Sequence, residues 1–152
     1  MYRRRPEATC LKRFFLMLIL VALISSTVAG CALISHYDAT SYQHATDLKA
    51  QSLLLIAKAT DPPGMHVAEI AAVQLKLLQA YEYERGKGKP NLITVQQWEL
   101  LNNPNGALMG GFLKKWQTEN AAQSPAFIKG VSKNVSAAFD EIIKLERAKV
   151  KD

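Results

Sequence analysis

The stretch from Ser124 to Ala148, SPAFIKGVSKNVSAAFDEIIKLERA, shows the clearest structural pattern in the chain. Ser124 places a capping hydroxyl before Pro125, and proline is favoured at the first position of a helix. Apolar side chains then recur at alternating spacings of three and four residues, at Ile128, Val131, Val135, Ala138, Ile142 and Leu145. This spacing is typical of a bundle helix, and the charged flanks, Glu146 among them, are expected to face solvent. The stretch therefore predicts a long amphipathic helix that packs on other helices.

Two further helices are predicted before the middle of the chain. Residues 42–59 place apolar side chains at helical spacing, and Asp61-Pro62-Pro63-Gly64 ends this first helix because proline disfavours helix at the residue before it. Residues 65–85 form the second predicted helix. The side chains expected to face inward from it are Val67, Ile70, Ala71, Leu75, Leu77, Leu78 and Tyr81.

Two shorter helices are expected between residues 94 and 116. Thr94 to Gln97 has the T-x-x-Q pattern of a capping box, which predicts that a short helix opens there. The turn signal at residues 102–106 separates this helix from a second one. Gly110-Gly111 in the second helix is interpreted as a local weakening rather than as a close helix contact. The apolar stripe of that helix consists of Leu108, Met109, Phe112, Leu113 and Trp116.

The predicted fold class is all-α. Only Leu92 to Val95 alternates apolar and polar side chains, and this stretch is too brief to predict a sheet. Short loops favour antiparallel neighbours, so we expect an antiparallel helical bundle. If the two short middle helices serve as one bent arm, the bundle has about four arms, and its C-terminus returns to the end where the chain enters.

The N-terminal residues have the three-part layout of an export signal. Basic residues, including Arg3, Arg4 and Arg5, precede an apolar run from Phe14 to Ile24, and small residues follow. This run is shorter than the roughly 20 residues that a membrane-spanning helix needs. An uncleaved signal-anchor is the alternative, because Phe14 to Ile34 would be long enough to cross a bilayer.

Val28, Ala29 and Gly30, followed by Cys31, resemble the lipobox of bacterial lipoproteins. The resemblance implies that the Cys31 sulfur receives diacylglycerol, that the chain is cut before Cys31, and that the new N-terminus is acylated. Ala32 follows the cysteine where an Asp would retain a lipoprotein in the inner membrane. Resemblance to lipoprotein sorting signals therefore implies the outer membrane of a Gram-negative cell.

These features predict three regions of the chain. Residues 1–30 are the signal peptide, residues 31–39 a lipidated tether, and residues 40–152 a helical bundle domain. The domain is expected on the periplasmic face of the membrane and close to its surface. Basic side chains near the C-terminus are expected to contact anionic headgroups there. These are Lys144, Arg147, Lys149 and Lys151.

Charge and cysteine content agree with export. The chain has 19 Lys and Arg residues and 13 Asp and Glu residues. Residues 1–30 contain five of the basic and one of the acidic residues, so the remainder has 14 basic and 12 acidic residues. A nearly neutral domain without a base-stacking motif argues against nucleic-acid binding. Cys10 is removed and Cys31 is lipidated, so the exported domain has no thiol to pair and must rely on packing.

No catalytic residue, metal site or cofactor is predicted. His66 and Glu69 share one helix face, but one His and one Glu are not a ligand set for zinc, and His66 is interpreted as a surface residue. The chain lacks the common nucleotide-binding and hydrolase motifs. Trp98 and Trp116 could belong to an interface, although core packing is the favoured interpretation of both.

Three stretches resemble a group of small uncharacterised proteobacterial lipoproteins. They are YDATSY at residues 37–42, LITVQQWELL at residues 92–101 and IIKLERAK at residues 142–149. Members of the group have a Tyr-Asp-x-x-Thr stretch after the lipobox cysteine, where this chain has its threonine one position earlier, at Thr40, and they end in an Ile-x-x-Leu-Glu-x-Ala-Lys helix. The resemblance supports a helical fold and implies no particular activity.

Three functions are compatible with these observations. The favoured one is a non-enzymatic interaction or structural module of the cell envelope, because no polar groups converge in a catalytic pattern. Its expected partners are the membrane, through the N-terminal lipid, and an envelope protein; no nucleic acid and no small-molecule substrate is indicated. The alternatives are an enzyme or accessory acting on cell-wall or lipid substrates, and a mobile-element lipoprotein that modifies surface receptors.

Overall fold

The computed structural model describes residues 35–149, which form one compact unit. The predicted signal peptide, the motif from Val28 to Cys31, the first part of the tether and Lys151 lie outside the described residues. Among the described helices, none combines the length and the hydropathy of a membrane-spanning segment.

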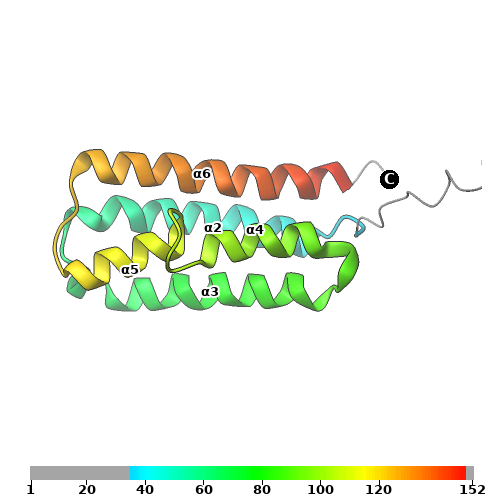
Figure 1. The fold of residues 1–152 in the computed structure, drawn as a ribbon, viewed down its shortest axis with the longest axis horizontal. Helices are drawn as coiled ribbons and strands as arrows, with labels where there is room; N and C mark the ends of the chain where they lie inside the picture. The colour runs from blue at the N-terminus through cyan, green and yellow to red at the C-terminus, as the bar shows by residue number, and fades with distance from the viewer. Residues whose placement is uncertain (1–34, 150–152) are drawn as a thin grey trace, which may run out of the picture. The chain divides into compact units, whose positions relative to one another are not determined.

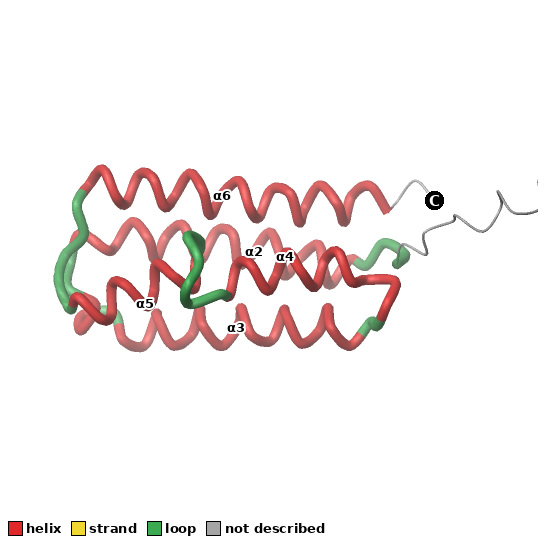
Figure 2. The backbone as a smooth tube through the Cα atoms, viewed as in Figure 1, coloured by secondary structure: helices red, strands yellow, loops and turns green. Residues whose placement is uncertain are grey.

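The described part of the chain is all-helical, which confirms the predicted fold class (Figures 1 and 2). Leu92 to Val95, the one stretch with alternating character, lies in a helix. The elements are α2 (Ala39–Ala57), η1 (Lys58–Thr60), η2 (Pro63–Met65), α3 (Val67–Gly86), η3 (Lys89–Asn91), α4 (Leu92–Asn102), α5 (Met109–Glu119) and α6 (Pro125–Ala148).

The helices form a bundle with two distinct ends. Helix α2 packs on both α3 and α6, and α4 also packs on α3 and α6, which closes the bundle. We call the base the end where residues 35–38, the C-terminal turn of α3, η3 and the C-terminal turn of α6 meet. The far end is where η1, η2 and residues 120–124 meet. Helix α5 continues beyond the end of α4 toward the far end (Figure 1).

Large apolar side chains fill the space between the helices. Trp98 and Trp116 are both fully buried, which confirms their interpretation as core residues. The rings of Trp98 and Phe139 meet edge to face, with centroids 6.0 Å apart. Other buried apolar side chains include Leu48, Leu55, Ile56, Ile70, Val73, Leu77, Leu101, Met109, Phe112, Leu113, Val131, Val135 and Ile142.

The predicted inner face of α3 is partly wrong. Val67, Leu75 and Leu78 are each more than half exposed. The buried stripe of α3 consists of Ile70, Val73, Leu77, Ala80 and Glu84. Only one narrow stripe meets α2 and α4, so Leu75 and Leu78 face outward.

The predicted capping box at Thr94 to Gln97 is also wrong. Helix α4 begins at Leu92, directly after η3, and Thr94 lies inside its first turn with a buried side chain. By contrast, Ser124 caps α6 as predicted, because its hydroxyl oxygen accepts a hydrogen bond from the Phe127 backbone N–H at 3.3 Å.

Gly110 and Gly111 mark a close backbone approach rather than a weakened helix. A Cβ atom at Gly110 would lie 2.2 Å from the carbonyl oxygen of Asn102, and one at Gly111 would lie 1.8 Å from that of Gly106. Both distances are far below van der Waals contact, so only glycine lets the start of α5 fold back onto the preceding loop.

The helical domain begins earlier than the expected boundary at residue 40. Asp38 is the N-cap of α2, and its carboxylate accepts hydrogen bonds from the backbone N–H groups of Thr40 and Ser41 at 2.8 and 3.4 Å. Ser35, expected in the tether, donates its backbone N–H to the carbonyl oxygen of Pro90 at 3.1 Å. The last residues of the predicted tether therefore belong to the base.

Candidate functional site

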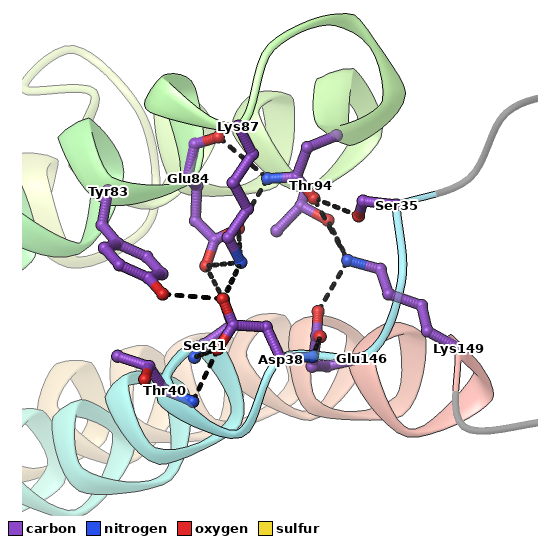
Figure 3. A network of polar contacts seen from close by, with 11 residues as sticks. Ser35, Asp38, Thr40, Ser41, Tyr83, Glu84, Lys87, Thr94, Glu146 and Lys149 are labelled. Atoms are coloured by element: carbon purple, nitrogen blue, oxygen red, sulfur yellow. Dashed lines mark hydrogen bonds and ion pairs between the residues drawn. The ribbon is translucent and has the colours of Figure 1, made fainter.

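The base contains a network of buried charged and polar side chains contributed by segments that are distant in sequence (Figure 3). Glu84 is 0% exposed and Glu146 is 1% exposed, so the expectation that Glu146 faces solvent is wrong. Lys149 is 6% exposed. Buried charges at this level are stable only when they are paired and hydrogen-bonded, which makes the partners of each group informative.

Glu146 joins the end of α6 to the beginning of α2. One of its carboxylate oxygens lies 2.6 Å from the Lys149 ammonium group. The other accepts a hydrogen bond from the backbone N–H of Asp38 at 2.7 Å. Both oxygens of Glu146 are therefore bonded within the protein, and the position at which the chain enters α2 is tied to the last helix.

Glu84 is bonded on all sides at the C-terminal turn of α3. Its carboxylate accepts hydrogen bonds from the Ser41 hydroxyl and from the side-chain amide of Asn91, the latter at 2.6 Å. The Lys87 ammonium group lies 3.2 Å from the same carboxylate. Glu84 is the buried member of the Tyr81 to Glu84 segment, in which Glu82 and Tyr83 are exposed.

Asn91 connects the buried Glu146–Lys149 pair to the partly buried Glu84–Lys87 pair. Its amide nitrogen donates to Glu84, while its amide oxygen accepts a hydrogen bond from Lys149 at 3.1 Å and one from the Ser35 hydroxyl at 2.8 Å. Lys149 also donates to the Thr94 hydroxyl at 3.3 Å. A single buried amide thus links α3, α6 and the segment before α2.

Asp38 completes the network at the protein surface. Besides capping α2, its carboxylate lies 2.9 Å from the Lys87 ammonium group and accepts a hydrogen bond from the Tyr83 hydroxyl at 2.7 Å. Partial burial by itself would raise the pKa of Asp38, but these hydrogen bonds outweigh it and hold the pKa well below its usual range. The hydrogen bond to the Asp38 carboxylate also raises the pKa of the Tyr83 hydroxyl, which donates it.

The neighbouring Ser41 and Lys87 do not form a nucleophile and its base. In such a pair the lysine must be neutral to accept the serine proton. Burial would lower the pKa of Lys87, but its bonds to Asp38 and Glu84 raise it overall and keep the amine protonated. Ser41 is itself buried and donates its proton to Glu84. The geometry is that of a structural network.

His66 lies at the far end, in a smaller polar group. Its imidazole Nε2 is 3.4 Å from the Asp61 carboxylate, its Nδ1 is 3.7 Å from the Glu69 carboxylate, and its ring lies 5.9 Å from that of Trp116. Only 12% of the His66 side chain is exposed, so it is more enclosed than predicted. Within residues 35–149, no three His, Cys, Asp or Glu side chains gather in a way that could hold a metal ion.

A shallow hollow lies on the outer surface between α3 and α4. It has a volume of about 720 Å³, and Leu78, Tyr81 and Leu100 provide its apolar lining. Glu99 accepts a hydrogen bond from the Tyr81 hydroxyl at 3.1 Å and forms part of its polar lining. The sequence pattern placed Leu78 in the core, so this surface was not predicted. The predicted inner face of α3 contained more apolar side chains than one stripe of a helix can bury, and this excess could have indicated an exposed apolar surface.

The residues predicted from the sequence to carry a site, Val28, Ala29, Gly30 and Cys31, lie outside the described residues. The network at the base was not predicted, because glutamate and lysine near a helix end normally indicate a solvated surface. Comparison with known proteins found no match to a protein-family model, to a curated protein or to a solved structure.

Proposed function

We propose that this chain is a bacterial lipoprotein whose helical bundle acts as a non-enzymatic interaction or structural module of the cell envelope. In this proposal residues 1–30 are removed, and Cys31 carries the lipid. The bundle lies on the periplasmic side of the outer membrane. Helices α4 and α5 together act as the fourth arm of an antiparallel bundle, and the resemblance to small proteobacterial lipoproteins supports the same assignment.

The observation that carries the interaction role is the outer surface of α3 and α4. Leu75, Leu78 and Leu100 are large apolar side chains that are each more than half exposed, and two of them border the hollow between the helices. Exposed apolar side chains that gather in one place, bordered by polar groups, are typical of protein interaction sites. An envelope protein that covers them is the proposed partner.

The network at the base supports the anchored part of the proposal. Ser35 is the fourth residue after Cys31, and a chain of that length spans at most about 14 Å. Ser35 and Asp38 are bonded to η3 and α6. A lipid on Cys31 would therefore hold the base next to the bilayer and leave the sides of the bundle accessible to a partner.

A photoreactive amino acid placed at Leu78 or Leu100 in intact cells tests the interaction role. We expect a reproducible crosslink to one envelope protein from both positions, and none from Lys133, an exposed residue of α6. Absence of any crosslink from Leu78 and Leu100 would refute this surface as the site of interaction.

The anchor is tested with Cys31→Ser. We expect the natural protein to be processed before residue 31, to carry acyl chains and to fractionate with membranes. The variant should remain unprocessed. A variant that is still cut before residue 31 would contradict the assignment of Cys31.

The enzymatic alternative has less support. Two buried carboxylates do lie at the base, but the oxygens of Glu84 and Glu146 are bonded to Ser41, Asn91, Lys149 and the Asp38 backbone. These bonds leave neither of the two carboxylates poised to act on a substrate. The mobile-element alternative depends on gene neighbourhood and stays a prediction.

A further inference from the structure

The base exposes large apolar side chains around its buried polar network. Leu92 is 56% exposed and Ile93 is 59% exposed, at the first turn of α4, and Tyr37, just before α2, is 40% exposed. Exposure of leucine and isoleucine side chains to water costs free energy, which contact with an apolar partner would recover.

Two observations place these side chains together. The hydrogen bonds from Ser35 to Pro90 and Asn91 hold the segment that contains Tyr37 beside η3, the turn that leads directly into Leu92. In a helix each Cα–Cβ bond tilts toward the N-terminus, and the N-terminus of α4 lies at the base. Leu92 and Ile93 therefore lean toward the end of the molecule at which the chain enters the bundle.

Basic side chains accompany them, although not all of those expected from the sequence. Lys149 cannot contact headgroups, because its ammonium group is buried and bonded to Glu146, Asn91 and Thr94. Lys89 in η3 and Arg147 in the last turn of α6 are both exposed. The base thus combines apolar side chains with exposed cations, the composition of surfaces that rest in a membrane interface.

We propose that the base is a membrane-contacting surface, in which Tyr37, Leu92 and Ile93 enter the interfacial layer of the bilayer and Lys89 and Arg147 bind anionic lipid headgroups. The inference deepens the proposed function and rests on it, because Cys31 lies only four residues before Ser35 and brings the base to the bilayer. The contact fixes the orientation of the bundle, since a lipid on a short tether alone would allow it to tilt.

The first experiment uses the protein purified from cell membranes, in vesicles of phosphatidylethanolamine and phosphatidylglycerol, with and without bromine on the acyl chains. Ile93→Trp is compared with Leu54→Trp, an apolar position on α2 that is 68% exposed and lies toward the far end. We expect bromine to quench most of the emission added at residue 93 and to leave that at residue 54 unchanged. The buried Trp98 and Trp116 contribute equally to both variants. Equal quenching at both positions, or none at residue 93, would overturn the proposal.

The second experiment measures protection of Lys89 in the same vesicles. A membrane-impermeant amine reagent should label Lys89 severalfold more slowly than Lys133, an exposed residue of α6 distant from the base. The double variant Leu92→Ser, Ile93→Ser should abolish this difference, and the matched control Leu54→Ser should preserve it. A ratio that is unchanged in the double variant would overturn the role of the two apolar side chains.

Mass spectrometry of Cys31 on the same preparation separates this inference from the proposed function. A chain without lipid on Cys31 contradicts the anchor, whatever the fluorescence shows. A lipidated chain whose Ile93→Trp emission is not quenched contradicts only the contact of the base with the bilayer.

Discussion

Different kinds of polar contact join the segments at each of the two ends of the bundle. At the far end the enclosed connections are neutral: the Trp116 indole N–H donates to the carbonyl oxygen of Asp61 at 3.1 Å, and the Gln123 backbone N–H donates to the carbonyl oxygen of Ala59 at 2.7 Å. The ion pair there, between Lys58 and Glu69, is exposed. At the base the connections run through buried charged side chains: Glu84 binds Ser41 and Asn91, Glu146 binds the Asp38 backbone N–H, and Lys149 binds Asn91. Loss of one partner from a neutral pair leaves a dipole, whereas loss of one from a buried ion pair leaves a charge. The base should therefore be the more sensitive end.

The largest expected effect is that of Glu146→Ala. The substitution leaves the buried Lys149 charge without its carboxylate and the Asp38 N–H without its acceptor. We expect the free energy of unfolding to fall by about 3–5 kcal/mol, the usual cost of removing one partner from a buried ion pair. Urea unfolding of the protein without residues 1–30 measures it.

A double substitution shows whether the charge causes that loss. Glu146→Leu combined with Lys149→Met removes both charges and keeps apolar volume at the base. Replacement of a whole buried ion pair by apolar groups is often neutral, so the double variant should be more stable than Glu146→Ala. If it is as unstable as the single variant, the contact with Asp38 matters more than the charge.

The next effect lies between the two ends, at the start of α5. Gly111→Ala would place a methyl group against the carbonyl oxygen of Gly106, so the loop must shift. We expect a loss of about 1–3 kcal/mol, the usual cost of overpacking. Thermal unfolding followed by circular dichroism measures it. A stability equal to that of the natural protein would show that the loop accommodates a side chain.

Low pH should destabilise the base of the bundle through protonation of Asp38. Because bonds to Lys87 and Tyr83 hold its pKa below the ordinary value, the unfolded chain takes up a proton first as the pH falls below about 4, and stability declines from there downward. Asp38→Asn keeps a capping side chain but lacks this titration. Its stability should be lower near pH 7 and should fall less steeply in acid.

Urea unfolding at several pH values tests this dependence, with Asp47→Asn at an exposed position of α2 as the control. The control should follow the curve of the natural protein. A variant at Asp38 with the same acid slope as the natural protein would show that other carboxylates govern the decline.

The smallest expected effect is a gain. Gly130 lies in α6, and a Cβ atom added there meets no atom within 4 Å. Gly130→Ala should raise stability by about 0.5–1 kcal/mol, because alanine loses less backbone entropy than glycine in a helix. The opposite signs at Gly111 and Gly130 distinguish a glycine required by close contact from one that is not, and the same thermal measurement compares them. A loss at Gly130 would contradict this distinction.

The far end was more predictable than the base because its signals are local. Pro62 and Pro63 end the first helix region, and Ser124 with Pro125 begins α6, as the sequence indicates. The partners at the base are remote: Lys149 and Asn91 are 58 residues apart, and Asp38 and Glu146 are 108 residues apart. No local pattern distinguishes a glutamate that will meet such a partner from one that will face water.

The sequence by itself determined the all-helical fold, the position of most helix boundaries, and the burial of Trp98 and Trp116. These properties follow from periodicity, capping residues and prolines, all of which act over a few residues. The tertiary structure decided which stripe of α3 is buried, that Gly110 and Gly111 meet the preceding loop, and that charges at the base are enclosed. These depend on which surfaces the neighbouring helices bring together, since burial is a property of the assembled helices and not of any one segment.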